Sequence, residues 1–137
     1  MPTLRISSEK VCYVVVKARE FDVKVAPEWL DDGSNPTHDG MTRILEDYAD
    51  DPTLAELQSY LKALDDDELE DLVALTWLGR GDFTIDEWED LMSEVRDVRA
   101  SQNTVRYLIG IPLLGDYLED GLAEFGLSCT EFEIDHM

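Results

Sequence analysis

The stretch that decides the fold prediction is Trp77-Leu78-Gly79-Arg80-Gly81-Asp82, in which two glycines surround one arginine. Arg80 is the only cation between Lys62 and Arg96, and the residues between those two include twelve acids. Glycine favours the left-handed conformation that ends a helix abruptly. The stretch therefore predicts a tight turn between two strongly acidic helices, with one guanidinium at the joint.

Helix start signals lie on both sides of this turn. Asp65 and Glu68 form one capping-box pattern, and Thr84 and Glu87 form another. After Thr84, apolar side chains repeat at helical spacing, at Ile85, Trp88, Leu91, Met92, Val95 and Val98. The two patterns predict one helix that ends at the glycines and a second helix that begins after them.

Other parts of the chain carry weaker helical signals. Residues 9–25 fit a helix better than a strand, although Val14-Val15-Val16 would also suit a strand. Further helices are predicted over 41–48, after a Thr53/Glu56 capping box, after a cap at Thr104, and from Leu114 to a stop at Gly126. Residues 31–52 are predicted to be a loop-rich connection, and residues 127–137 an irregular tail.

These elements predict a single all-α domain over residues 1–137, built as a compact orthogonal or antiparallel bundle of five to seven helices. Residues 81–89 resemble the second half of an EF-hand. However, Leu78 and Arg80 stand where a calcium loop needs oxygen ligands. We therefore expect an EF-hand-like helix–loop–helix without metal ligands.

The net charge of −21 is unevenly distributed. Residues 1–30 carry five cations against four acids, whereas residues 31–137 carry six cations against twenty-eight acids. Such a surface repels nucleic acid and anionic lipid and attracts basic proteins. We expect a possible basic protein partner, no direct nucleic-acid binding and no membrane association, although solubility alone would also explain the charge.

The two cysteines are far apart in the sequence, and neither lies in a CxxC motif. We expect Cys12 and Cys129 to be free thiols, with Cys12 in the core. No signal peptide is visible, and no apolar run approaches the ~20 residues that span a bilayer. These features predict a cytoplasmic protein.

Several motifs together resemble a bacterial family known only as domain of unknown function 3775. They are Leu72-Val73-Ala74-Leu75-Thr76-Trp77-Leu78-Gly79-Arg80-Gly81-Asp82, Tyr107-Leu108-Ile109-Gly110-Ile111-Pro112-Leu113-Leu114-Gly115-Asp116-Tyr117-Leu118, Gly121-Leu122 with Phe125-Gly126, and Glu9-Lys10-Val11 with Lys17-Ala18-Arg19-Glu20. The resemblance covers most of the chain apart from the loop near 31–50 and the tail. It implies no activity, cofactor or catalytic residue.

The candidate binding residues are Trp77, Arg80 and Asp82. Arg80 could anchor an anion in a groove, but an ion pair with Asp82 or a bond to the last carbonyls of its helix is the more common role of such a residue. Trp77 could be an interface anchor, although core packing is again the more common outcome.

A row of acids along one helix face offers an alternative metal site, at Asp86, Asp90 and Glu94. Such a row could hold Mg²⁺ for phosphate hydrolysis, but the face opposite a complete apolar stripe normally points to solvent. His38 and His136 are the only histidines, and no complete catalytic set is visible. We predict no catalytic residue and no cofactor.

Three functions remain open at the level of sequence. The favoured one is a non-catalytic protein-binding or regulatory module whose partner is a basic protein. The second is a divalent-metal-dependent hydrolase of phosphate compounds that uses the acidic row. The third is a protein whose acidic surface mimics the charge of nucleic acid.

Overall fold

A computed structural model of the chain describes residues 3–31, 51–101 and 103–130. Every regular element within those ranges is a helix, which confirms the all-α prediction. The first segment, which could have been a strand, is also helical. Among the helices of the described ranges, none combines the length and the apolar character needed to cross a membrane.

The described ranges contain six α-helices and one 3₁₀ turn, η1. They are α1 (Ser8–Asp31), α3 (Pro52–Ala63), α4 (Asp66–Arg80), η1 (Ile85–Glu87), α5 (Trp88–Ser101), α6 (Thr104–Ile109) and α7 (Leu114–Glu124). The helix predicted over 41–48 lies outside the described residues. The helix–turn–helix of α4, η1 and α5 is present, whereas its likeness to an EF-hand stays a prediction.

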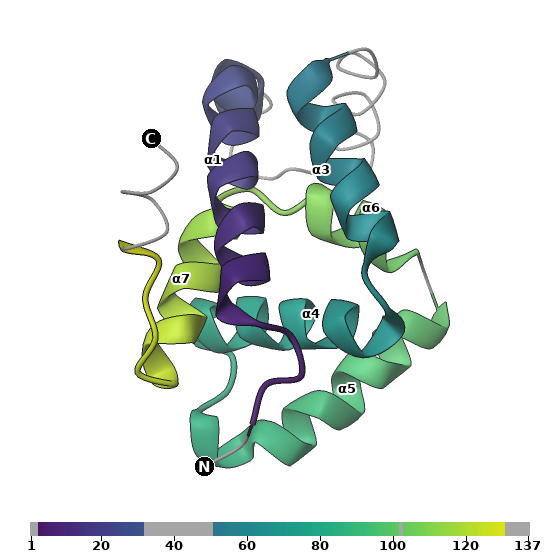
Figure 1. The fold of residues 1–137 in the computed structure, drawn as a ribbon, viewed down its shortest axis with the longest axis vertical. Helices are drawn as coiled ribbons and strands as arrows, with labels where there is room; N and C mark the ends of the chain where they lie inside the picture. The colour runs from purple at the N-terminus through teal and green to yellow at the C-terminus, as the bar shows by residue number, and fades with distance from the viewer. Residues whose placement is uncertain (1–2, 32–50, 102, 131–137) are drawn as a thin grey trace.

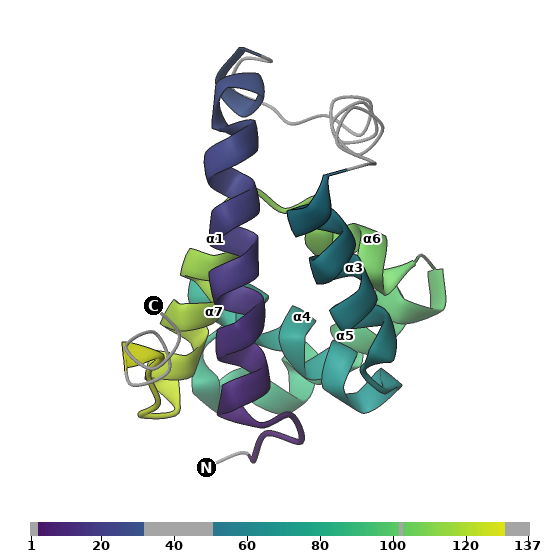
Figure 2. The same ribbon diagram turned by 45° about the horizontal axis from the view of Figure 1, so that its top comes forward.

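Helix α4 is the centre of the fold. Figure 1 shows α1 and α3 standing roughly upright above α4, while α5 runs obliquely beneath it. The view in Figure 2 shows the same upright pair with α7 beside α1. Helix α4 packs against both α5 and α7, and all of its residues from Leu69 to Leu78 are buried. A helix buried on every side needs apolar residues all around, and the run Leu72-Val73-Ala74-Leu75 supplies them.

Two glycines allow α4 and α7 to approach closely. A Cβ atom on Gly79 would lie 1.8 Å from the carbonyl oxygen of Tyr117, and one on Gly121 would lie 2.3 Å from the carbonyl oxygen of Leu75. Neither position has room for a side chain. Gly79 and Gly121, which both lie in segments that resemble the family, therefore serve helix packing.

Local signals placed most helix ends correctly. The Asp65/Glu68 capping box opens α4, and Gly81, at φ 92°, closes it in the left-handed conformation. The Thr84/Glu87 capping box is also present, but it opens η1, which leads into α5. The helix that ends the fold stops before Gly126, at φ 74°.

Two predicted caps were wrong by a short distance. Asp51 caps α3 by accepting the N–H groups of Thr53 and Leu54, because Pro52 is well suited to the first helical position. Thr53 therefore lies inside the helix. Helix α6 is capped by Asn103, which accepts the N–H of Arg106, and Thr104 is the first helical residue.

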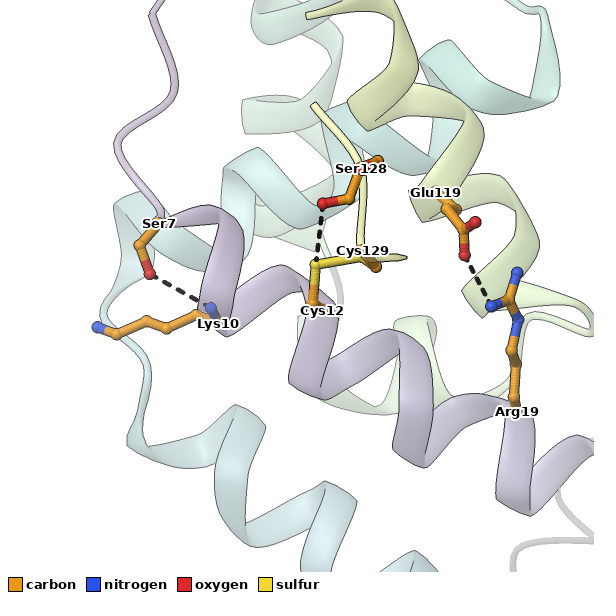
Figure 3. Close-up of a disulfide and its surroundings, with 7 residues drawn as sticks. All are labelled: Ser7, Lys10, Cys12, Arg19, Glu119, Ser128 and Cys129. Carbon is orange, nitrogen blue, oxygen red and sulfur yellow. Dashed lines mark hydrogen bonds and ion pairs between the residues drawn. A yellow bond between two sulfur atoms is a disulfide. The ribbon is translucent and has the colours of Figure 1, made fainter. Parts of the chain in front are cut away.

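The prediction of free cysteines was wrong, because Cys12 and Cys129 form a disulfide. The bond joins α1 to the segment that follows α7, and Figure 3 shows the two sulfur atoms between those elements. Cys12 is 2% exposed, as expected for a core residue, and Cys129 is fully buried. The two cysteines are 117 residues apart in the sequence, so patterns of neighbouring residues could not predict that they pair.

Candidate functional site

The most densely bonded polar site of the described residues surrounds Asp71, in the middle of α4. One carboxylate oxygen of Asp71 accepts the backbone N–H groups of Arg5, at 2.6 Å, and Ile6, at 3.2 Å. The other oxygen accepts Nη2 of Arg5 at 2.9 Å and Nε at 3.3 Å. Asp71 is only 1% exposed, so these donors compensate a charge that would otherwise be costly to bury.

The Arg5 guanidinium also reaches two further carboxylates of α4. Its Nη1 lies 2.9 Å from Asp67, and its Nη2 lies 3.4 Å from Glu70, which is 3% exposed. Partial burial acts to lower the pKa of Arg5, but the hydrogen bond to Asp71 and the charges of Asp71 and Asp67 outweigh it and raise that pKa. Arg5 therefore stays charged throughout the physiological pH range.

A pocket of about 430 Å³ opens beside this cluster. Helix α5 supplies the apolar Trp88 and Met92 and, on the same wall, the exposed Glu89 and Arg96. Nε of Arg96 lies 3.8 Å from Glu70, so a second guanidinium approaches the same buried carboxylate. The lining residues are Thr3, Arg5, Asp71, Trp88, Glu89, Met92 and Arg96.

The sequence folds this way because the segment before α1 has no helical partner for its backbone. Asp71 provides the missing acceptors for the N–H groups of Arg5 and Ile6. The buried side chain of Ile6 fixes the segment against the core on the other side. Arg5 is thus held at the mouth of the pocket by its backbone as well as by its charge.

The structure brings the predicted binding residues Trp77, Arg80 and Asp82 together in a separate cluster. Arg80 and Asp82 form a two-point ion pair, with Nε at 2.8 Å and Nη2 at 2.6 Å from the same carboxylate oxygen. Trp77 is 7% exposed and donates Nε1–H to the hydroxyl of Tyr107 at 3.0 Å. Its ring also stacks on Phe83, with 6.3 Å between the centroids.

These contacts stabilise the turn between α4 and η1, so all three residues have a structural role there. Burial acts against the charge of Arg80, but the bond to Asp82 and the neighbouring Tyr107 raise the pKa of Arg80 above its usual value. The indole of Trp77 is largely covered, which agrees with the core-packing interpretation. A binding role for this cluster stays a prediction.

The acidic row of the alternative metal site lies on the surface. The side chains of Asp86, Asp90 and Glu94 are all exposed on η1 and α5. In the part of the chain that the structure describes, no group of three or more His, Cys, Asp or Glu side chains is placed to hold a metal ion. His38 and His136 lie outside the described residues.

The Arg5 pocket brings two guanidiniums, the carboxylates of Asp71 and Glu89 and an apolar wall together, and Arg5 links it to the carboxylates of Asp67 and Glu70. A second, more open hollow of about 470 Å³ lies between α1 and α3, where Tyr13 and Tyr60 stack at 4.2 Å. It holds Glu56 and Ser59 and has fewer charged groups than the first.

No local sequence pattern pointed to Arg5, Glu70 or Asp71. The available signal was a pair of adjacent acids between Leu69 and Leu72, inside a helix that is otherwise apolar at its centre. Such acids require a cation, and Arg5 is the first one in the chain. Which cation they pair with depends on contacts 65 and 66 residues apart along the sequence.

Residues 54–127 match the family described as "Protein of unknown function (DUF3775)". The matched residues make up more than half of the chain and run from α3 to just beyond α7. The amino-terminal motifs Glu9-Lys10-Val11 and Lys17-Ala18-Arg19-Glu20 lie outside them. No curated protein and no solved structure matches the chain.

Proposed function

This chain belongs to the DUF3775 family of proteins of unknown function, and we propose that it is a non-catalytic binding module that holds a basic segment of a protein partner. The observation that carries the proposal is the Arg5 site. There, one arginine is bound by Asp67, Glu70 and Asp71 at the edge of an open pocket. The fold can therefore bind a guanidinium through both charge and directed hydrogen bonds.

The rest of the pocket suits a second basic side chain, supplied by a partner. The exposed carboxylate of Glu89 lies on the rim, while Trp88 and Met92 offer an apolar surface for the aliphatic stem of an arginine or lysine. Arg5 and Arg96 neutralise part of the local charge. The net charge of −21 over the whole chain still favours approach by a cationic partner.

We place this activity in the cytoplasm. Cytoplasmic reductants keep most thiols reduced, and the disulfides that form there are typically transient or redox-sensing. In that compartment the Cys12–Cys129 bond would be one of the transient or redox-sensing disulfides.

The test is titration with a short peptide of alternating arginine and glycine, followed by fluorescence polarisation at low salt. We expect Glu89→Lys to weaken binding about fivefold, because it reverses the charge on the pocket rim. The matched control is Glu124→Lys, which makes the same change at an exposed position at the end of α7.

The outcomes separate three situations. Weakening by Glu89→Lys alone supports a site at the pocket. If both variants weaken peptide binding equally, the peptide is attracted by the overall negative charge of the protein, which contradicts the proposed site. Absence of binding at about 0.05 M salt, where surface charges are poorly screened, contradicts the proposed function itself.

A further inference from the structure

Cys129 is the one buried residue in the stretch from Gly126 to Thr130 that follows α7. Its neighbours Leu127, Ser128 and Thr130 are all exposed. Burial of side chains is the main stabilising contribution to packing, so exposed residues add little to the attachment of a segment. The attachment of this stretch therefore depends on the side chain of Cys129.

The partner of Cys129 is firmly held without it. Cys12 lies in α1, whose side chains Val11, Val14 and Val15 are completely buried in the core. Besides the disulfide, Sγ of Cys12 lies 3.9 Å from the carbonyl oxygen of Ser128, which is a weak contact (Figure 3). Loss of the disulfide would leave α1 in place and release the segment after α7.

The start of this segment can act as a hinge. Gly126 adopts φ 74°, and a Cβ atom there would meet nothing within 4 Å, so there is open space on that side of the backbone. The N–H of Leu127 still bonds to the carbonyl oxygen of Leu122 at 3.0 Å, which closes the end of α7. When residues 127–130 swing away, this bond opens, while α7 up to Glu124 keeps its place.

We propose that the Cys12–Cys129 bond is a redox-operated latch that fastens the segment after α7 to α1 and releases it when a dithiol reductant acts. A thiolate of the reductant attacks one sulfur of the bond, and the other sulfur leaves as a thiolate and takes up a proton. The second thiol of the reductant then attacks the mixed disulfide. The protein gains two electrons and two protons as two thiols, and the reductant becomes a disulfide.

The latch differs from a structural staple in its access to reductant. Both sulfur atoms are buried, so reduction requires an opening. A staple is reduced only when the whole protein unfolds. The latch is reduced when a local movement of the exposed residues around Cys129 uncovers a sulfur atom, and residues 127–130 move away from α1 once the bond is broken. This distinction follows from the exposed neighbours of Cys129 and does not rest on the proposed binding of a basic partner.

The experiment is reduction of the whole oxidised chain in the absence of denaturant. The starting material is verified by its mass, which is lower by two hydrogens than that of the dithiol form. A small-molecule dithiol is added, and free thiols are counted over time beside the far-ultraviolet dichroism. We expect complete reduction with the helical signal retained, and at least a tenfold faster hydrogen exchange of the Leu127 amide.

Two results would overturn the latch. One is reduction that proceeds only at the rate of global unfolding or only in denaturant. The other is reduction without any change in the exchange of the Leu127 amide. The double variant Cys12→Ala/Cys129→Ala is the control for side effects of the reductant. It should show the fast exchange in the presence and absence of dithiol, and slow exchange in this variant would likewise reject the proposal.

Discussion

Helix α7 contacts its two neighbours by different physical means. Towards α4, the glycines Gly79 and Gly121 let the two backbones touch, and the atoms nearest to each glycine are backbone atoms of the other helix. Towards α1, the same helix is joined by ion pairs of Arg19, at 2.9 Å to Asp116 and 2.7 Å to Glu119. Figure 3 shows the Arg19–Glu119 pair in the same region as the disulfide.

The comparison shows how one small domain combines a fixed contact with a responsive one. Close packing of uncharged backbone is insensitive to salt, to pH and to redox conditions. Charge pairs respond to salt, a carboxyl that titrates near neutral pH responds to pH, and a disulfide responds to redox conditions. The α1 face also includes a close approach, because a Cβ atom on Gly115 would lie 2.9 Å from the carbonyl oxygen of Val15. We therefore expect the close approach of α7 to α4 to be insensitive to solution conditions, and the contact of α7 with α1 to depend on them in part.

Removal of the disulfide should have the largest effect. For a sequence separation of 117 residues, the chain-entropy treatment gives a loss of about 5 kcal/mol in the free energy of unfolding. We expect urea unfolding of Cys12→Ala/Cys129→Ala to show a loss of about 2–5 kcal/mol. A change below about 1 kcal/mol would mean that the bond does not constrain the unfolded chain.

Gly121→Ala should be the next most costly change. The new Cβ would lie 2.3 Å from a backbone carbonyl oxygen of Leu75, so α7 must shift as a whole. We expect a loss of about 3 kcal/mol or more in the free energy of unfolding. Gly126→Ala is the control, because it strains the backbone at φ 74° but meets no neighbour, and it should cost about 1 kcal/mol. If both variants lost the same free energy of unfolding, the close packing at Gly121 would contribute nothing beyond the backbone conformation of a glycine.

Asp22, on the α1 side, should make stability depend on pH. Burial raises the pKa of Asp22 to about 7, with the N–H of Leu113 and the charge of Arg19 acting against it and the charge of Asp116 adding to it. The folded state thus binds this proton more tightly than the unfolded state. The contribution of Asp22 to stability is greatest below pH 4, declines as the pH rises to about 7, and changes little above that.

Asp22→Asn tests this dependence by removing the titrating group. At pH 8 we expect the variant to be about 2 kcal/mol more stable than the parent protein, a figure reduced for the partial exposure of the side chain. At pH 4 the two should be equal. The control is Asp120→Asn on α7, an exposed position that should show no difference at either pH. An Asp22→Asn variant that is less stable at pH 8 would contradict the burial argument.

Arg19→Met should have the smallest effect. Methionine keeps the aliphatic stem, which packs near Gly115, and loses the charge that pairs with Asp116 and Glu119. Because all three side chains are partly exposed, we expect a loss of about 0.5–1 kcal/mol in low salt. Thermal unfolding of both proteins at matched pH would measure it. A loss above about 2 kcal/mol would show that these pairs are more than surface contacts.

The sequence predicted those features whose causes are local. The capping boxes at Asp65 and Thr84 and the left-handed stop at Gly81 each depend on residues within a few positions, and all three are present. The shift of the α3 cap from Thr53 to Asp51 is also local, and Pro52 was the signal that could have placed it.

The features that could not be predicted join distant parts of the chain. The disulfide of Cys12 and the binding of Arg5 by Asp71 depend on how the helices pack against each other. A short stretch of sequence contains no information about that packing. Conversely, the Trp77–Arg80–Asp82 cluster was found because its members are neighbours in sequence, and its ion pair is the structural one that such neighbours commonly form. Proximity in sequence favoured that cluster over the Arg5 pocket as a candidate site.

The salt dependence of two variants tests the contrast between the faces of α7 most directly. The free energy of unfolding is measured for the parent protein, Gly121→Ala and Arg19→Met at about 0.05 M and about 1 M sodium chloride, where the screening length falls from above 10 Å to about 3 Å. We predict that the loss caused by Gly121→Ala is the same at both salt concentrations, while the loss caused by Arg19→Met disappears at the higher one. Losses that shrink in parallel, or a Gly121→Ala variant as stable as the parent, would contradict the view that charge contributes to the α1 face and not to the close approach at α4.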